Sequence, residues 1–99
     1  MKFRDAKILL DKQVPLPLES YSVRRSSTME EGEYGECSVV APYKKIIIKI
    51  NKNVPEIAQI DSLIHECAHG LLAGTSDFAE HGPLWGVCFA KCYCAVYQE

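Results

Sequence analysis

Within Asp61-Ser62-Leu63-Ile64-His65-Glu66-Cys67-Ala68-His69-Gly70, the pattern His-Glu-x-x-His lies in a segment that has the apolar spacing of an amphipathic helix. Residues four apart share one face of a helix, so His65 and His69 can hold one metal ion between their imidazoles. Glu66 follows the first histidine, and its carboxylate can reach a water on that metal. The spacing therefore indicates the metal-binding helix of a zinc hydrolase.

The helix around this motif has start and stop signals of its own. Asn53 is the expected N-cap, because Glu56 follows three residues later as in a capping box. We expect the helix to run to about Ala73, where Gly74 can end it. Its predicted apolar face comprises Ile57, Ile60, Leu63, Ile64, Cys67 and Leu71.

Three strands are predicted before this helix, over residues 21–28, 37–41 and 44–51. The third is the clearest, because Ile46, Ile48 and Ile50 alternate with Lys45, Ile47 and Lys49. A turn-rich acidic segment, residues 30–35, connects the first two strands, and Pro42-Tyr43 marks a turn before the third. The pattern predicts a small sheet with one buried face.

A helix is predicted on each side of this central region. Residues 3–12 have apolar side chains at helical spacing, and the proline-rich segment 14–18 ends that helix. Pro83 can open a last helix that runs to about Tyr97. Its predicted buried stripe comprises Trp85, Cys88, Phe89, Cys92 and Val96. The whole chain, residues 1–99, therefore reads as one α+β domain.

Composition narrows the classes of protein to consider. The 99 residues carry a formal net charge of -2, which gives no general attraction to nucleic acid or to an anionic membrane. No apolar run approaches the roughly 20 residues of a membrane helix, and the first residues lack the apolar core of a secretory leader. Five cysteines, an odd number, favour free thiols in a reducing, intracellular and cytoplasmic setting.

The third histidine of the chain is the expected third metal ligand. His81 opens the string His81-Gly82-Pro83-Leu84-Trp85, twelve residues after His69. Catalytic zinc commonly takes three protein ligands and keeps a fourth position for water. A loop after the metal-binding helix can bring His81 back to the same face, and Trp85 would then anchor the last helix to the core. Glu80 and Asp77 are the alternative third ligands, because they lie near the same loop end.

The two motifs together resemble the SprT-like family of zinc metallopeptidases. In that family the pattern is His-Glu-x-x-His-Ala, a loop, and then His-Gly-x-x followed by an aromatic residue. Gly70 stands here in place of the usual alanine, and Trp85 in place of the usual phenylalanine. Tyr34-Gly35-Glu36-Cys37 and the isoleucine-rich strand also resemble the sheet that precedes the family's active-site helix. The resemblance covers roughly residues 34–97.

The resemblance implies a minimal zincin. A small three-stranded, mainly antiparallel sheet would pack on an N-terminal helix, the metal-binding helix and a C-terminal helix. His65, His69 and His81 would bind Zn²⁺, and Glu66 would be the general base in the hydrolysis of a peptide or protein substrate. An extended peptide would pair with the edge of the strand over residues 45–51. The chain also resembles stand-alone cores that phages encode, which adds a viral origin, in the host cytoplasm, as an alternative.

Two other functions stay open at this stage. One is a non-catalytic zinc-containing module for binding or assembly, although a structural site has no need of Glu66 beside its ligands. The other is a DNA-associated protease that acts on DNA–protein crosslinks. The basic pairs Arg24-Arg25 and Lys44-Lys45 are more typical of a solvated charged face than of a DNA site.

We interpret the cysteines and tyrosines mainly as packing residues. Cys88, Cys92 and Cys94 form no C-x-x-C pair, so core packing is favoured over a second metal site or a cysteine nucleophile. The same holds for Cys67, inside the metal motif. No oxyanion stabiliser can be assigned, and the candidates by residue type are Tyr21, Tyr34, Tyr43, Tyr93 and Tyr97.

Overall fold

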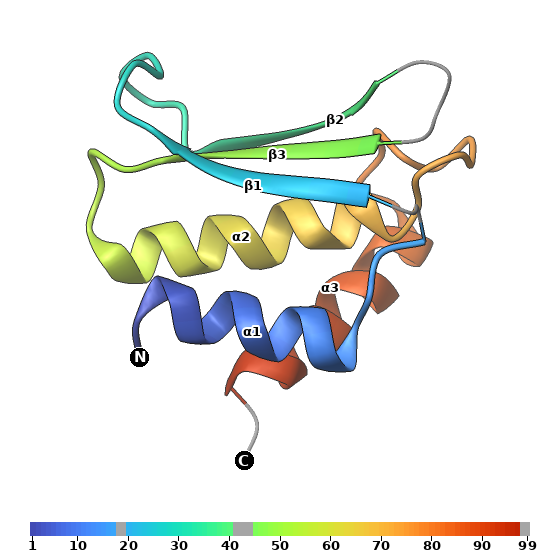
Figure 1. Ribbon diagram of the computed structural model, residues 1–99. Helices are drawn as coiled ribbons and strands as arrows, with labels where there is room; N and C mark the ends of the chain where they lie inside the picture. Colours follow the sequence, from blue (N-terminus) through green and yellow to red (C-terminus); the bar gives the residue numbers. More distant parts are fainter. Residues whose placement is uncertain (18–19, 41–44, 98–99) are drawn as a thin grey trace.

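The protein is described by a computed structural model that covers residues 1–17, 20–40 and 45–97. In chain order its elements are α1 (Phe3–Gln13), β1 (Ser20–Ser26), β2 (Gly35–Val40), β3 (Lys45–Asn51), α2 (Glu56–Gly70) and α3 (Pro83–Tyr97). The three strands form one sheet, and the three helices lie on the same side of it, with α2 closest (Figure 1). This arrangement confirms the predicted α+β class.

The sheet is mixed, whereas the resemblance implied a mainly antiparallel one. The strand order is β1-β3-β2, so β3 lies in the centre. It pairs antiparallel with β2 and parallel with β1. β2 runs opposite in direction to β1. Because β3 is antiparallel to β2, it is parallel to β1. Alternation of side chains predicts each strand and its buried face, but it carries no information on strand order.

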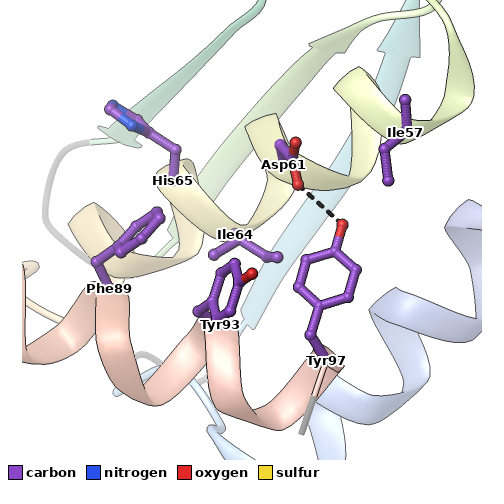
Figure 2. Close-up of a pocket in the computed structure, with 7 residues that line it drawn as sticks. All are labelled: Ile57, Asp61, Ile64, His65, Phe89, Tyr93 and Tyr97. Carbon is purple, nitrogen blue, oxygen red and sulfur yellow. Dashed lines mark hydrogen bonds between the residues drawn. The ribbon is translucent and has the colours of Figure 1, made fainter.

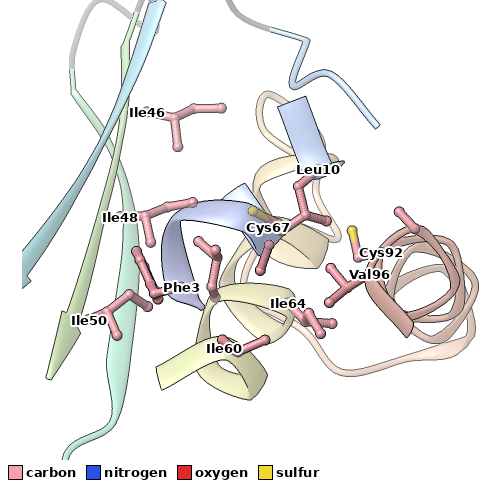
Figure 3. Close-up of a cluster of buried hydrophobic side chains, with 13 residues drawn as sticks. Phe3, Leu10, Ile46, Ile48, Ile50, Ile60, Ile64, Cys67, Cys92 and Val96 are labelled. Atoms are coloured by element: carbon pink, nitrogen blue, oxygen red, sulfur yellow. The ribbon is translucent and has the colours of Figure 1, made fainter. Parts of the chain in front are cut away.

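The core lies between the inner face of β3 and the helices. Ile46, Ile48 and Ile50 are fully buried, and their side chains point from the sheet toward α1 and α2 (Figure 3). Cys92 and Val96 of α3 close the core on its far side. The outer face of the sheet is polar, with an ion pair between Lys49 and Glu36 at 3.5 Å. The predicted alternation of buried and solvated positions on β3 is confirmed.

Replacing Ile48 by alanine is expected to lower the free energy of unfolding by about 2–5 kcal/mol, because it leaves a cavity in the centre of the only sheet of the described residues. Ile47 is the matched control, since it lies on the same strand and faces away from the helices. Its replacement by alanine should cost about 1 kcal/mol or less. Urea denaturation followed by circular dichroism measures both, and equal losses would place the core on the wrong face.

Helix α2, which carries His65 and His69, is shorter than predicted at both ends. Asn53 is not its N-cap: Pro55 occupies that position, and the Asn53 side chain donates to the Ser27 carbonyl instead. At the other end α2 stops at Gly70, and tight turns follow up to Gly74, which adopts a φ of 84°. The predicted apolar face is buried at Ile60, Leu63, Ile64 and Cys67, but Ile57 is 59 % exposed.

The last helix has the predicted bounds, but only its second half is buried. Cys92 and Val96 lie in the core as expected. Trp85, Cys88 and Phe89 are half-buried. Trp85, in the first turn of α3, packs against His65 of the metal-binding motif, and Phe89 packs against the edge of the core. The five cysteines are free thiols.

Several predicted features lie outside the described residues. They are the Pro42-Tyr43 turn, the first residue of the predicted strand 44–51 and the last residues of the predicted segments 37–41 and 14–18. Among the helices that are described, none combines the length and the hydropathy that crossing a membrane requires.

Candidate metal centre

Three histidines from two separate segments converge at the C-terminal half of α2. His65 and His69 are one turn apart on α2, and His81 lies two residues before α3 begins. The Nε2 atom of His81 is 3.2 Å from that of His65 and 3.1 Å from that of His69. The structure therefore brings together the three residues that the sequence predicts as ligands, and they could hold a metal ion.

Hydrogen bonding fixes which nitrogen of His69 faces this point. Its Nδ1 lies 2.8 Å from the carbonyl oxygen of Phe78, which can only accept, so Nδ1 carries the proton. In the neutral ring, Nε2 then presents a lone pair toward His81. Lone pairs on neighbouring Nε2 atoms repel each other unless a cation or a proton lies between them. In histidine metal sites, the ring nitrogen that does not bind the metal donates to an outer acceptor, which orients the ring. The carbonyl of Phe78 is such an acceptor for His69.

The spacing of the three nitrogens is compatible with one shared metal ion. Imidazole nitrogens bind zinc at about 2.0–2.1 Å, and two ligands of a tetrahedral ion are then about 3.3 Å apart. Two of the three separations, 3.1 and 3.2 Å, are close to that value, and the three ligand atoms all lie within 4.8 Å of one another. Three protein ligands with a fourth position for water would match the pattern of catalytic zinc sites.

The alternative ligands are not part of this cluster. Among the described histidine, cysteine and acidic side chains, the group that could hold a metal consists of the three histidines. The backbone of Asp77 instead donates to the Thr75 hydroxyl, and its carbonyl accepts from the amide of Glu80 in the loop between the two helices.

Trp85 covers the histidine cluster from the first turn of α3. Its ring centroid lies 4.9 Å from those of His65 and His81 and 5.6 Å from that of His69. Phe89 stacks behind it, at 5.1 Å between centroids. Trp85 was expected to anchor α3 to the core, and it instead packs against the imidazoles. An aromatic wall of this kind limits the positions that the three rings can take.

Glu66 lies beside the cluster, under the start of β2. Its side chain is 8 % exposed and lines two hollows, one shared with Tyr34 and His65 and the other with Cys37 and His69. Gly35 makes room for it, because a Cβ at that position would lie 3.2 Å from Cγ of Glu66. The sequence indicated Glu66 by its place in the motif but gave no sign of the part that Gly35 plays.

Burial dominates the electrostatics around Glu66. Burial, and then the negative charge of Glu36, raises the pKa of Glu66 to about 7. Burial also lowers the pKa of His65 and of His69, which keeps both rings neutral and able to bind a metal. The Cys37 thiol has its pKa raised to about 12, first by burial and then by Glu66. A bound cation would act on Glu66 in the opposite direction.

The tyrosines fall into separate environments. Tyr21 lies under Lys7 of α1, with 5.2 Å between the lysine Nζ and the centroid of the tyrosine ring. Tyr34 shares a hollow with Glu66, whereas Tyr93 and Tyr97 line a groove that starts at His65. Tyr43 lies outside the described residues.

Comparison with known proteins identifies no relative of this chain. The chain matches no protein-family model, no curated protein and no solved structure. The resemblance to the SprT-like family therefore stays a prediction from the two sequence motifs.

Proposed function

We propose that the chain is a zinc-dependent metallopeptidase of the SprT-like type, which hydrolyses peptide bonds in a protein or peptide substrate. The observation that supports this most is the convergence of three imidazole Nε2 atoms next to a buried carboxyl group on the same helix. A structural zinc site is satisfied by its ligands alone. The buried Glu66 is therefore best explained by proton transfer.

Each residue of the site has a distinct task in this reaction. Zinc, when bound, supplies a Lewis acid and lowers the pKa of its water toward neutrality. Glu66 takes a proton from the attacking water and delivers it to the leaving amine. The Phe78 carbonyl holds the ring of His69 in one orientation, and Trp85 packs against the ligands.

The strand edge that an extended substrate would use is not the one expected. β3 is paired on both sides, so its edge is not free and the prediction for residues 45–51 is wrong. In the described sheet, β2 is the edge strand nearest to Glu66, because Gly35 and Cys37 lie against that side chain and its hollows. A peptide that adds to β2 would run past the metal centre.

A DNA-associated activity has less support. Arg25 lies over the Phe3 ring at 4.9 Å and donates to Gln59, whereas Arg24 is exposed on the opposite face of the sheet. The first basic pair therefore does not form one patch. Lys44, in the second pair, lies outside the described residues. A cytoplasmic location stays a prediction from the cysteine content.

Metal analysis and a casein assay test the proposed function together. We expect one zinc per chain and casein hydrolysis that stops when a chelator removes the metal and returns when zinc is restored. Running the assay with and without DNA separates a general peptidase from a DNA-dependent one. Stoichiometric zinc with no hydrolysis of casein or of the chain itself, in either condition, would favour the non-catalytic zinc module instead.

Replacing Gly35 by alanine is expected to lower kcat severalfold without changing zinc affinity. The added Cβ would lie 3.2 Å from Glu66 Cγ and 3.2 Å from the Lys49 carbonyl oxygen, which is backbone and cannot easily move. The carboxyl group would therefore shift, and overpacking should cost about 1–3 kcal/mol of stability.

Gly86→Ala is the matched control for this substitution. Nothing lies within 4 Å of a Cβ at Gly86, which is inside α3, so alanine should stabilise the protein by about 0.5–1 kcal/mol. Steady-state kinetics, zinc competition and urea denaturation give the three quantities. Equal kcat values for the two variants would show that Gly35 does not position Glu66.

A further inference from the structure

A groove of about 560 Å³ runs between α2 and α3 and begins at the metal centre (Figure 2). The α2 wall is formed by Ile57, Asp61, Ile64 and His65, and the α3 wall by Phe89, Tyr93 and Tyr97. Its volume is in the range of sites that hold small ligands or single side chains. Because His65 belongs both to the groove and to the metal cluster, whatever binds here lies next to the reaction centre.

The two walls face each other across the groove. Phe89, Tyr93 and Tyr97 are four apart, as are Ile57, Asp61 and His65, so each set lies on one helix face. Phe89 lies opposite His65 at one end, and the Tyr97 hydroxyl donates to Asp61 Oδ1 at 2.8 Å toward the other (Figure 2). The aromatic rings of α3 form a continuous series, with 6.1 Å between Phe89 and Tyr93 and 4.9 Å between Tyr93 and Tyr97. The α3 side of the groove is thus aromatic from Phe89 to Tyr97, with successive rings tilted against each other by 32° and 55°.

The charge of the groove comes from one carboxylate. Asp61 is exposed, and neither lysine nor arginine is among the residues that line the groove. Tyr97 occupies one oxygen of Asp61, and the other can accept a further hydrogen bond. Asp61 also borders the hollow that contains Glu33 and Glu66, so the surface on that side carries negative charge as well. A cationic group is the complement of such a surface.

We propose that this groove binds a lysine or arginine side chain of the substrate next to the bond that is cleaved, with the cationic head at Asp61. This inference rests on the proposed peptidase function. One helical turn, about 6 Å, separates Asp61 from His65, and an extended lysine side chain spans roughly the same length. The aliphatic stem would lie on Tyr93 and Phe89, and the cation would lie near the rings of Tyr93 and Tyr97.

Matched fluorogenic peptides that differ at one residue beside the cleaved bond test the proposal. Lysine and norleucine have stems of similar length, but norleucine lacks the charge. We expect kcat/KM to be about fivefold higher for lysine, and the ratio to fall as salt rises, as for a solvent-accessible ion pair. Asp61→Asn should bring the ratio to about one. Tyr97→Phe removes the hydroxyl but not the charge and should keep the ratio, as should Asp5→Asn, a carboxylate on α1.

A binding experiment separates the failure of this inference from the failure of the proposed function. Tyrosine signals in NMR spectra of the zinc-loaded protein should shift with Nα-acetyl-lysine amide and not with Nα-acetyl-norleucine amide, and Asp61→Asn should remove the shifts. An active peptidase with equal rates on the two peptides would overturn the inference and leave the function intact. A protein that is inactive on all peptides but shows the shifts would overturn the function and support the groove.

Discussion

Replacing Glu66 by glutamine is expected to reduce kcat/KM for peptides by about 10²–10⁴-fold while one zinc stays bound to each chain. Positioned acid–base groups contribute rate factors of this size. Glutamine has nearly the same shape, so it fills the space next to Gly35, but it cannot take up the water proton. The loss should fall mainly on kcat, since Glu66 is not one of the three converging histidines that could hold the metal.

Glu80→Gln is the matched control for Glu66→Gln. It makes the same chemical change at an exposed residue next to His81, and Glu80 is also one of the alternative ligands from the sequence. Peptide kinetics and metal analysis should find this variant close to the parent. Activity that survives in Glu66→Gln would show that another group transfers the proton. Loss of zinc in Glu80→Gln would instead show that the ligand set is wrong.

The second large effect is expected from His81→Ala, which should weaken zinc binding by at least 100-fold. The Nε2 of His81 is the atom that lies near both of the others, at 3.1 and 3.2 Å, and its loss leaves two ligands on one helix face. Mutation of a residue that only hydrogen-bonds to a metal ligand typically lowers metal affinity by 10–100-fold, so the loss of a ligand itself should lower it further. Competition with a coloured chelator measures the change.

His81 is a better position for this test than His69. His81 is exposed and lies in a loop, so alanine there opens no cavity in the core, whereas His69 is buried. The far-ultraviolet circular dichroism of the apo form should therefore be unchanged. Asp77→Asn, in the same loop, serves as the control and should keep the parent affinity. Unchanged affinity in His81→Ala would remove His81 from the site.

The parts of the site that could be predicted were those set by spacing along the chain. The four-residue interval of His65 and His69 fixes their common helix face, and the string that begins at His81 pointed to a return of the chain. Isoleucines at alternate positions likewise predicted the buried face of β3, because alternation in a strand corresponds directly to its two faces.

The parts that escaped prediction depend on contacts between distant segments. The hydrogen bond to His69 comes from a backbone carbonyl, that of Phe78, and every residue has one, so no side chain marks it. Ile57 continued the apolar spacing of α2, but it lines an open groove because α3 covers only part of that face. Asn53 has the right residue type for an N-cap, and the carbonyl of Ser27 binds its side chain instead.

The strand order has a consequence for how the protein forms during synthesis. β3 is the last of the three strands to leave the ribosome and yet lies between the other two. In the described sheet, neither β1 nor β2 has a strand partner until the chain has been made through Asn51. The helix with the first two histidines emerges directly afterwards, and the third histidine follows a loop later. The sheet is therefore completed only when synthesis reaches the middle of the chain, and the three histidines come together after it, once the loop that contains His81 has been made.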